Sequence, residues 1–167
     1  MKILKITPWT IGCATDSEDT LDFRESVFSQ GNGYMGVRGY APEGEKKHGF
    51  ERSTFLSGFF EYIKPGTTDM VNQPDFSVFR IALNGSDVSA YTRTGYEETL
   101  NLKDGTFTRR YIAADEQGRR TKVETIRFLS MDNVHTAAVR LRVTPENYDG
   151  ELMLETGIDG GVVNLPI

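Results

Sequence analysis

Hydrophobic and polar residues alternate with a period of two along much of the chain, which is the pattern of half-buried β-strands. In Thr106 to Ala113, for example, Phe107, Arg109 and Tyr111 share one predicted face. Only residues 22–29 are expected to form a short helical turn. The segments with the strand pattern are residues 75–83, 96–102, 106–113, 120–129, 135–143 and 152–158.

Turn signals separate these segments about every dozen residues. Asn84-Gly85 tolerates the positive φ of a tight hairpin turn and predicts a return strand at residues 87–90. Asp104-Gly105, residues 115–118 and Asp132-Asn133 are further polar turns. Short strands with regular turns are typical of an antiparallel β-sandwich or barrel. The predicted fold class is therefore all-β.

Composition restricts the class of protein further. The 167 residues are 38% hydrophobic, enough for a single domain, 1–167, with its own core. With 19 Lys and Arg against 24 Asp and Glu, the net charge of -5 argues against a nucleic-acid partner. The first residues lack the apolar run of a signal peptide, and no segment is apolar enough to span a bilayer. We expect a cytoplasmic protein without a membrane partner.

Residues that could carry chemistry are few. Cys13 has no second cysteine for a disulfide, and His48 and His135 lie outside any metal-ligand spacing. No Gly-x-Ser-x-Gly motif is present. Three pairs of candidate carboxylates occur at predicted turns or polar edges, where solvation explains them, and Asp159 is a further candidate by residue type. We expect no catalytic, cofactor-binding or metal-binding residue in this chain. These candidates are Glu43 with Glu45, Glu97 with Glu98, Asp115 with Glu116, and Asp159.

Four glycines lie close together in residues 31–39, GNGYMGVRG. A phosphate-binding loop is one interpretation, but no Gly-Lys-Ser/Thr follows and no amphipathic helix begins after the run. Strand glycines that permit a bulge or a close backbone approach are the favoured interpretation. Arg38 is expected to form a buried ion pair with Glu25, and a ligand-binding arginine is the alternative.

Residues 50–62, FERSTFLSGFFEY, hold five aromatic side chains. Exposed aromatic rings stack on sugars in carbohydrate-binding modules. Phenylalanine has no polar group and favours burial, so core packing or a buried interface with another domain is the preferred interpretation.

An ordered series of motifs resembles the N-terminal domain of glycoside hydrolase family 65 over nearly the whole chain. The series begins with Pro8-Trp9 and continues with ESVFSQGNGYMGVRG at residues 25–39. It goes on with VNQP at 71–74, LNG at 83–85, Gly105 followed by Arg109-Arg110, RFLS at 127–130 and IDGGVVN at 158–164.

The resemblance implies a family of maltose, kojibiose, nigerose and trehalose phosphorylases with some hydrolases. Such enzymes invert α-glucosides with one general-acid Glu and inorganic phosphate as the attacking co-substrate, and no other cofactor is implied. The acid and the phosphate site belong to an α/α barrel after the N-terminal domain, and nothing in this chain resembles that barrel. The implied fold is a galactose-mutarotase-like super-sandwich, of which this chain supplies the first part; the final segment, residues 159–167, likewise reads as cut short.

The resemblance also implies partners. The catalytic barrel and a second copy in a homodimer are expected, with residues 41–52 and 62–74 as loops that reach the active-site rim. The segment before Val71-Asn72 is shorter and less rich in Trp than in the phosphorylases, so the disaccharide stays open. The leading function is an accessory and assembly domain of such an enzyme. A free-standing carbohydrate-binding module and a structural domain without a ligand are the alternatives.

Overall fold

A computed structural model describes residues 3–43 and 53–164 of the chain, and the strands in these ranges dominate the fold. The helical elements are α1 (Leu21–Val27) and two single 3-10 turns, Glu18–Thr20 and Val88–Ala90. None of the helices in the described ranges is long and apolar enough to cross a membrane. The strands are β1 (Leu4–Ile6), β2 (Thr10–Cys13), β3 (Gln30–Gly31), β4 (Met35–Val37), β5 (Thr54–Lys64), β6 (Thr67–Asn72), β7 (Asp75–Leu83), β8 (Ser86–Asp87), β9 (Thr92–Asn101), β10 (Thr106–Ala114), β11 (Arg120–Leu129), β12 (Ala137–Pro145) and β13 (Leu152–Asp159).

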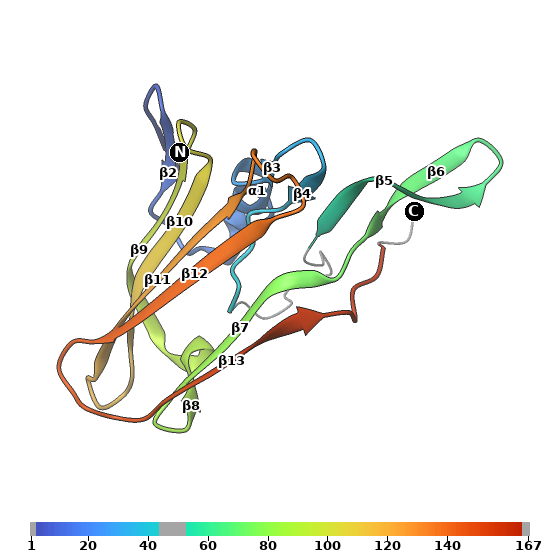
Figure 1. The fold of residues 1–167 in the computed structure, drawn as a ribbon. Coiled ribbons are helices and arrows are strands. Elements are labelled where there is room, and N and C mark those ends of the chain that lie inside the picture. Colours follow the sequence, from blue (N-terminus) through green and yellow to red (C-terminus); the bar gives the residue numbers. More distant parts are fainter. Residues whose placement is uncertain (1–2, 44–52, 165–167) are drawn as a thin grey trace.

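The strands form three sheets, and every described pairing is antiparallel (Figure 1). The largest sheet has the order β1-β2-β9-β10-β11-β12. A second sheet has the order β13-β7-β8, and a third the order β3-β4-β5-β6. The all-β, antiparallel prediction is confirmed.

One face of the largest sheet carries the core. Near one end, Ile81 and Leu83 of β7 pack with Tyr111 of β10 and Val123 of β11. Near the other end, Phe28, which follows α1, stacks on Phe107 of β10, with ring centroids 5.3 Å apart. Because Phe107 and Tyr111 point to the same side of β10, α1 and β7 cover the same face. The result is a sandwich of two layers.

Most predicted strands occur where the alternation placed them. β7 and β11 have the predicted bounds, β10 and β13 each end one residue later, and β12 begins two residues later. The chain doubles back after Asn84-Gly85 as predicted, but the return strand is only β8, Ser86–Asp87, rather than residues 87–90. It ends there because the Asp87 side chain accepts a hydrogen bond from the Ser89 N–H (2.9 Å) and starts a 3-10 turn. The strands β1 and β2 were not predicted.

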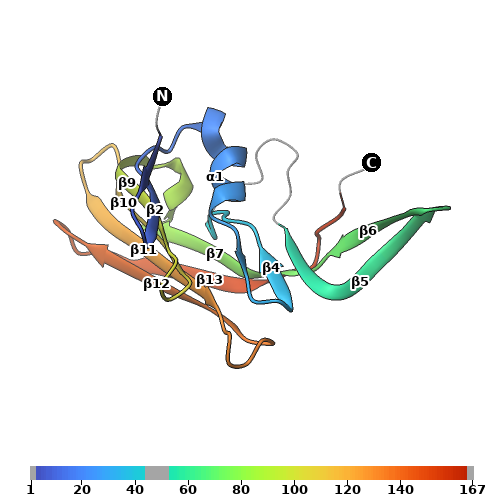
Figure 2. The same ribbon diagram turned by 90° about the horizontal axis from the view of Figure 1, so that it is seen from above.

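The predicted loop at residues 62–74 is instead part of a long hairpin, β5–β6. Its turn is Pro65-Gly66, where Gly66 has φ 79°, as position i+2 of a type II turn requires. Register shifts in β5, between Phe55 and Phe60 and between Tyr62 and Lys64, interrupt the alternation. The hairpin projects away from the sheets that carry the core (Figures 1 and 2).

The glycine-rich run forms β3, a turn and β4 rather than one continuous strand. Asn32 joins this turn to the β11–β12 turn, because its side chain donates to the carbonyl oxygens of Ser130 (2.7 Å) and Val134 (3.0 Å). Gly39 lies directly against Phe28, where an added Cβ would be 2.6 Å from the Phe28 Cβ. The predicted close backbone approach is therefore present at Gly39.

Candidate functional site

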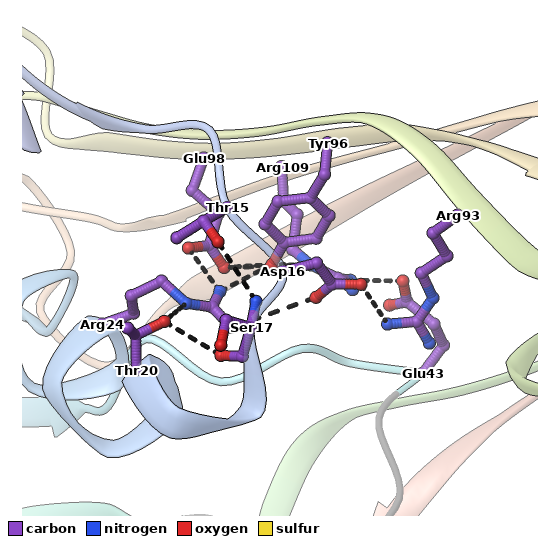
Figure 3. Close-up of polar contacts among 10 residues, drawn as sticks. All are labelled: Thr15, Asp16, Ser17, Thr20, Arg24, Glu43, Arg93, Tyr96, Glu98 and Arg109. Atoms are coloured by element: carbon purple, nitrogen blue, oxygen red, sulfur yellow. Dashed lines mark hydrogen bonds and ion pairs between the residues drawn. The ribbon is translucent and has the colours of Figure 1, made fainter. Parts of the chain in front are cut away.

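A cluster of ionisable side chains lies inside the sandwich, between α1 and the largest sheet (Figure 3). All its members are buried, and they come from α1, the segment after β4, β9 and β10. The members are Arg24, Glu43, Tyr96, Glu98 and Arg109.

The register of β9 and β10 brings the cluster together. Tyr96, Glu98 and Leu100 alternate on the inward face of β9, and Glu98 stands directly opposite Arg109 of β10. The neighbouring pair, Arg110 opposite Glu97, points the other way and is exposed. Period-two alternation therefore sends one Arg–Glu pair into the core and the next to solvent.

The Tyr96 hydroxyl is the centre of the hydrogen-bond network. It donates to the Glu98 carboxylate (2.5 Å) and accepts from the guanidinium groups of Arg24 (2.9 Å) and Arg109 (3.0 Å). Arg24 also donates to Glu98 (2.8 Å). Burial raises the pKa of Tyr96 well above its ordinary value, so the phenol keeps its proton.

Arg109 joins the sheet to the segment that follows Tyr40. Its guanidinium donates to the carboxylate of Glu43, and both side chains are only 1% exposed. Burial, the largest single effect, would raise the pKa of Glu43, but the charge of Arg109 and the hydrogen bonds to the carboxylate together hold this pKa below its ordinary value. Asp16 and Arg93 lie beside the cluster, and their ion pair is 3.4 Å long (Figure 3).

Two arginines and two carboxylates thus balance in charge inside the domain. Their side chains are at most 3% exposed, so solvent and substrate do not reach them. Buried, mutually paired groups of this kind fix geometry rather than perform chemistry. The cluster attaches α1 and the Glu43 segment to the large sheet.

This cluster corrects the prediction for the carboxylates. Glu43 and Glu98 were expected to be solvated, and both are buried ion-pair partners. Glu97 is solvated as expected. Asp115 lies in its predicted turn but is not solvated as expected, because its side chain is only 6% exposed, pairs with Arg119 and accepts from the Gln117 and Arg119 N–H groups (3.0 and 2.9 Å). Glu116 of the same turn is exposed, Asp159 ends β13, and Glu45 lies outside the described residues.

The other predicted residues are dispersed. Glu25 and Arg38 form the predicted ion pair (3.5 Å), but it is only partly buried. Cys13 is buried, and His135 is exposed with its ring against Tyr34 (centroids 4.3 Å apart). His48 lies outside the described residues. Within residues 3–43 and 53–164, no three His, Cys, Asp or Glu side chains are grouped to hold a metal ion.

The aromatic stretch is the second correction. Phe59, Phe60 and Tyr62 of β5 are about half exposed or more, at 50%, 59% and 66%. The prediction that the aromatic side chains pack in the core of this chain is therefore wrong for Phe59, Phe60 and Tyr62. Phe50 lies outside the described residues. The reason is the hairpin itself, which extends beyond the sheets and leaves its rings without a covering layer (Figure 2).

Signals for the buried cluster were present in the sequence. Glu98 lies between Tyr96 and Leu100, and Arg109 between Phe107 and Tyr111, so alternation places both on inward faces. The residues that pair with them from elsewhere, Arg24 and Glu43, had no such signal, because short helices and connecting segments carry no strand period.

Comparison with known proteins finds one family model and relatives that agree with it. The model of the glycosyl hydrolase family 65 N-terminal domain matches residues 15–165. A kojibiose phosphorylase of Halothermothrix orenii is 32% identical over 160 residues, covering 93% of this chain and 20% of the relative. An alpha,alpha-trehalose phosphorylase of Thermoanaerobacter brockii is 29% identical and covers 94% of this chain and 22% of the relative.

A solved structure has the same fold. It is a putative kojibiose phosphorylase from human microbiome, with a TM-score of 0.88 and 22% sequence identity, and the match covers 96% of this chain and 23% of that structure. The chain thus spans about a fifth of the length of the curated relatives it matches. By the match over residues 15–165, the chain belongs to the family of the glycosyl hydrolase family 65 N-terminal domain.

Proposed function

We propose that this chain is the non-catalytic N-terminal part of a longer enzyme that cleaves α-glucosyl disaccharides, with inorganic phosphate as co-substrate. The observation that carries the proposal is the family match over residues 15–165, together with phosphorylase relatives that are about five times as long. The catalytic α/α barrel would lie in the part of the enzyme outside residues 1–167.

The electrostatics of the described carboxylates support a structural role. A general acid for glycoside cleavage needs a raised pKa and access to the substrate. Glu43 has neither, because Arg109 lowers its pKa and the side chain is buried. Burial does raise the pKa of Glu25, but Arg38 is paired with its carboxylate. We therefore assign no catalytic residue to this chain.

The test is an activity assay of the longer enzyme on kojibiose, nigerose, trehalose and maltose, each with and without inorganic phosphate. We expect cleavage of at least one disaccharide that depends on phosphate and releases glucose 1-phosphate. Cleavage that proceeds equally without phosphate would make the enzyme a hydrolase, and no cleavage of any of the four would contradict the proposal.

A second candidate function is binding of carbohydrate by the domain alone. The exposed rings of Phe59, Phe60 and Tyr62 favour it, because aromatic faces stack on pyranose rings. Titration calorimetry of the isolated chain with the same disaccharides separates the two functions. An assembly domain gives no saturable heat, whereas a binding module gives a saturation curve that Tyr62→Ala abolishes. The homodimer and the cytoplasmic location stay predictions from the sequence.

A further inference from the structure

The β5–β6 hairpin exposes several apolar side chains along its two strands. The register places Phe60 opposite Met70 and Tyr62 opposite Thr68, so Phe60, Tyr62 and Met70 share one face. They are 59%, 66% and 38% exposed. Phe59 and Ile63, also about half exposed, flank Glu61 along the same strand. Exposed apolar side chains gathered on a projecting element are typical of an interaction surface.

The opposite face carries a charge pattern that needs a partner. Glu61 stands directly opposite Asp69, and like charges in this position repel each other. Asn164 donates to Glu61 (3.4 Å) and the Met70 N–H donates to Asp69 (2.8 Å), but neither contact supplies positive charge. Among the described residues, no Lys or Arg forms an ion pair with either carboxylate. A basic side chain on a docked surface would remove the repulsion.

These charges also select between occupants. A second copy that packed its Glu61–Asp69 face against its symmetry mate would bring four carboxylates together, which adds repulsion. A second copy packed through the Phe60, Tyr62 and Met70 face would leave Glu61 and Asp69 opposite each other without a positive partner. A different surface, apolar and with an Arg or Lys opposite Glu61 and Asp69, matches both faces of the hairpin.

The end of the described chain lies at the base of the hairpin. The Asn164 side chain accepts from the Asn72 N–H (2.7 Å), and the Asn72 side chain donates to the Val163 carbonyl (3.3 Å). The last described residues, Val163 and Asn164, therefore lie beside the end of β6.

We propose that β5–β6 is a docking arm that inserts into an apolar groove, lined by at least one Arg or Lys that pairs with Glu61 and Asp69, in the catalytic part of the longer enzyme. This inference rests on the proposed function. It adds which element of the domain contacts the catalytic part and which kinds of side chain line the surface that binds this element.

Thiol labelling tests the arm, since the single native thiol, Cys13, is buried. Thr68→Cys places a small reporter opposite Tyr62 without removing an apolar ring, and Thr94→Cys places the same reporter at an exposed position of β9. We expect maleimide to modify Thr68→Cys at least about tenfold more slowly in the longer enzyme than in the isolated chain. The rate for Thr94→Cys should be the same in both.

The charge part of the inference is tested in the same assay. Adding Glu61→Lys and Asp69→Lys to the Thr68→Cys enzyme should restore fast labelling, because the basic groove would repel the arm. Equal labelling of Thr68→Cys in chain and enzyme would overturn the inference. So would protection in the isolated chain that grows with its concentration, which assigns the arm to a second copy, or protection that the two lysines leave intact.

Phosphorolysis measured on the same enzyme preparations separates the two proposals. If the enzyme is active but Thr68→Cys is labelled as fast as in the isolated chain, the docking arm is rejected and the proposed function stands. If Thr68→Cys is protected but the enzyme cleaves none of the four disaccharides, the proposed function is rejected and the docking arm stands.

Discussion

Replacing Arg109 with Met removes the cation that holds Glu43 inside the domain. Both side chains are 1% exposed, so the Glu43 carboxylate would stay buried without a positive partner. Loss of one partner of a buried ion pair costs about 3–5 kcal/mol of unfolding free energy. That is a large share of the roughly 5–15 kcal/mol that stabilises a domain of this size.

Urea unfolding of the 167-residue chain, followed by circular dichroism, measures the effect. With a denaturant slope of about 2 kcal/mol per molar, Arg109→Met should lower the unfolding midpoint by about 2 M. Arg110→Met is the matched control, because the next residue pairs with Glu97 on the outer face, where the side chains are 50% and 43% exposed. Such surface pairs contribute about 0–1 kcal/mol, so its midpoint should fall by at most about 0.5 M.

A double variant separates the loss of the ion pair from the change in side-chain size at position 109. Replacing both members, with Arg109→Met and Glu43→Leu, leaves no uncompensated charge and should recover most of the lost stability. Equal midpoints for Arg109→Met and Arg110→Met, or a double variant less stable than Arg109→Met alone, would refute the reasoning that the buried pair fixes this part of the fold.

Two further predictions concern burial and packing. Burial raises the pKa of Tyr111 above its ordinary value of 10.0, so above that pH only the unfolded chain releases the proton and stability falls as pH rises. In urea unfolding at pH 9 to 11.5, Tyr111→Phe should make this fall shallower by up to about 1.4 kcal/mol per pH unit, and an unchanged slope would contradict it. Gly39→Ala should destabilise by about 1–3 kcal/mol, since its Cβ would lie 2.6 Å from Phe28. In the same unfolding assay Gly36→Ala, with no atom within 4 Å, should change stability by less than about 0.5 kcal/mol, and equal losses would disprove the close approach.

Strand alternation predicted most of the large sheet. β11 has the expected bounds and buries Val123, Thr125, Arg127 and Leu129 on one face. It could be predicted because its alternation is regular and it pairs with the strands next to it in the sequence. The β5–β6 hairpin escaped prediction because register shifts and exposed rings hide the period there.

The buried cluster was only half visible in the sequence. Glu98 and Arg109 occupy inward positions by alternation, yet burial of a charge requires its partners to be known. Those partners, Arg24 and Glu43, are more than 50 residues from the residues they bind, and only the folded chain brings them together. Alternation in the sequence therefore indicates the inward face of these strands, although Glu98 was expected to be solvated, and only the folded chain shows the pairing.

The most direct test of the proposed function compares the isolated chain with the longer enzyme in one assay. Both are incubated with kojibiose and inorganic phosphate, then with nigerose, trehalose and maltose, and the release of glucose 1-phosphate is measured. The proposed function predicts release by the longer enzyme from at least one disaccharide and none by residues 1–167 alone. Release by the isolated chain, or none by the longer enzyme from all four, would contradict it.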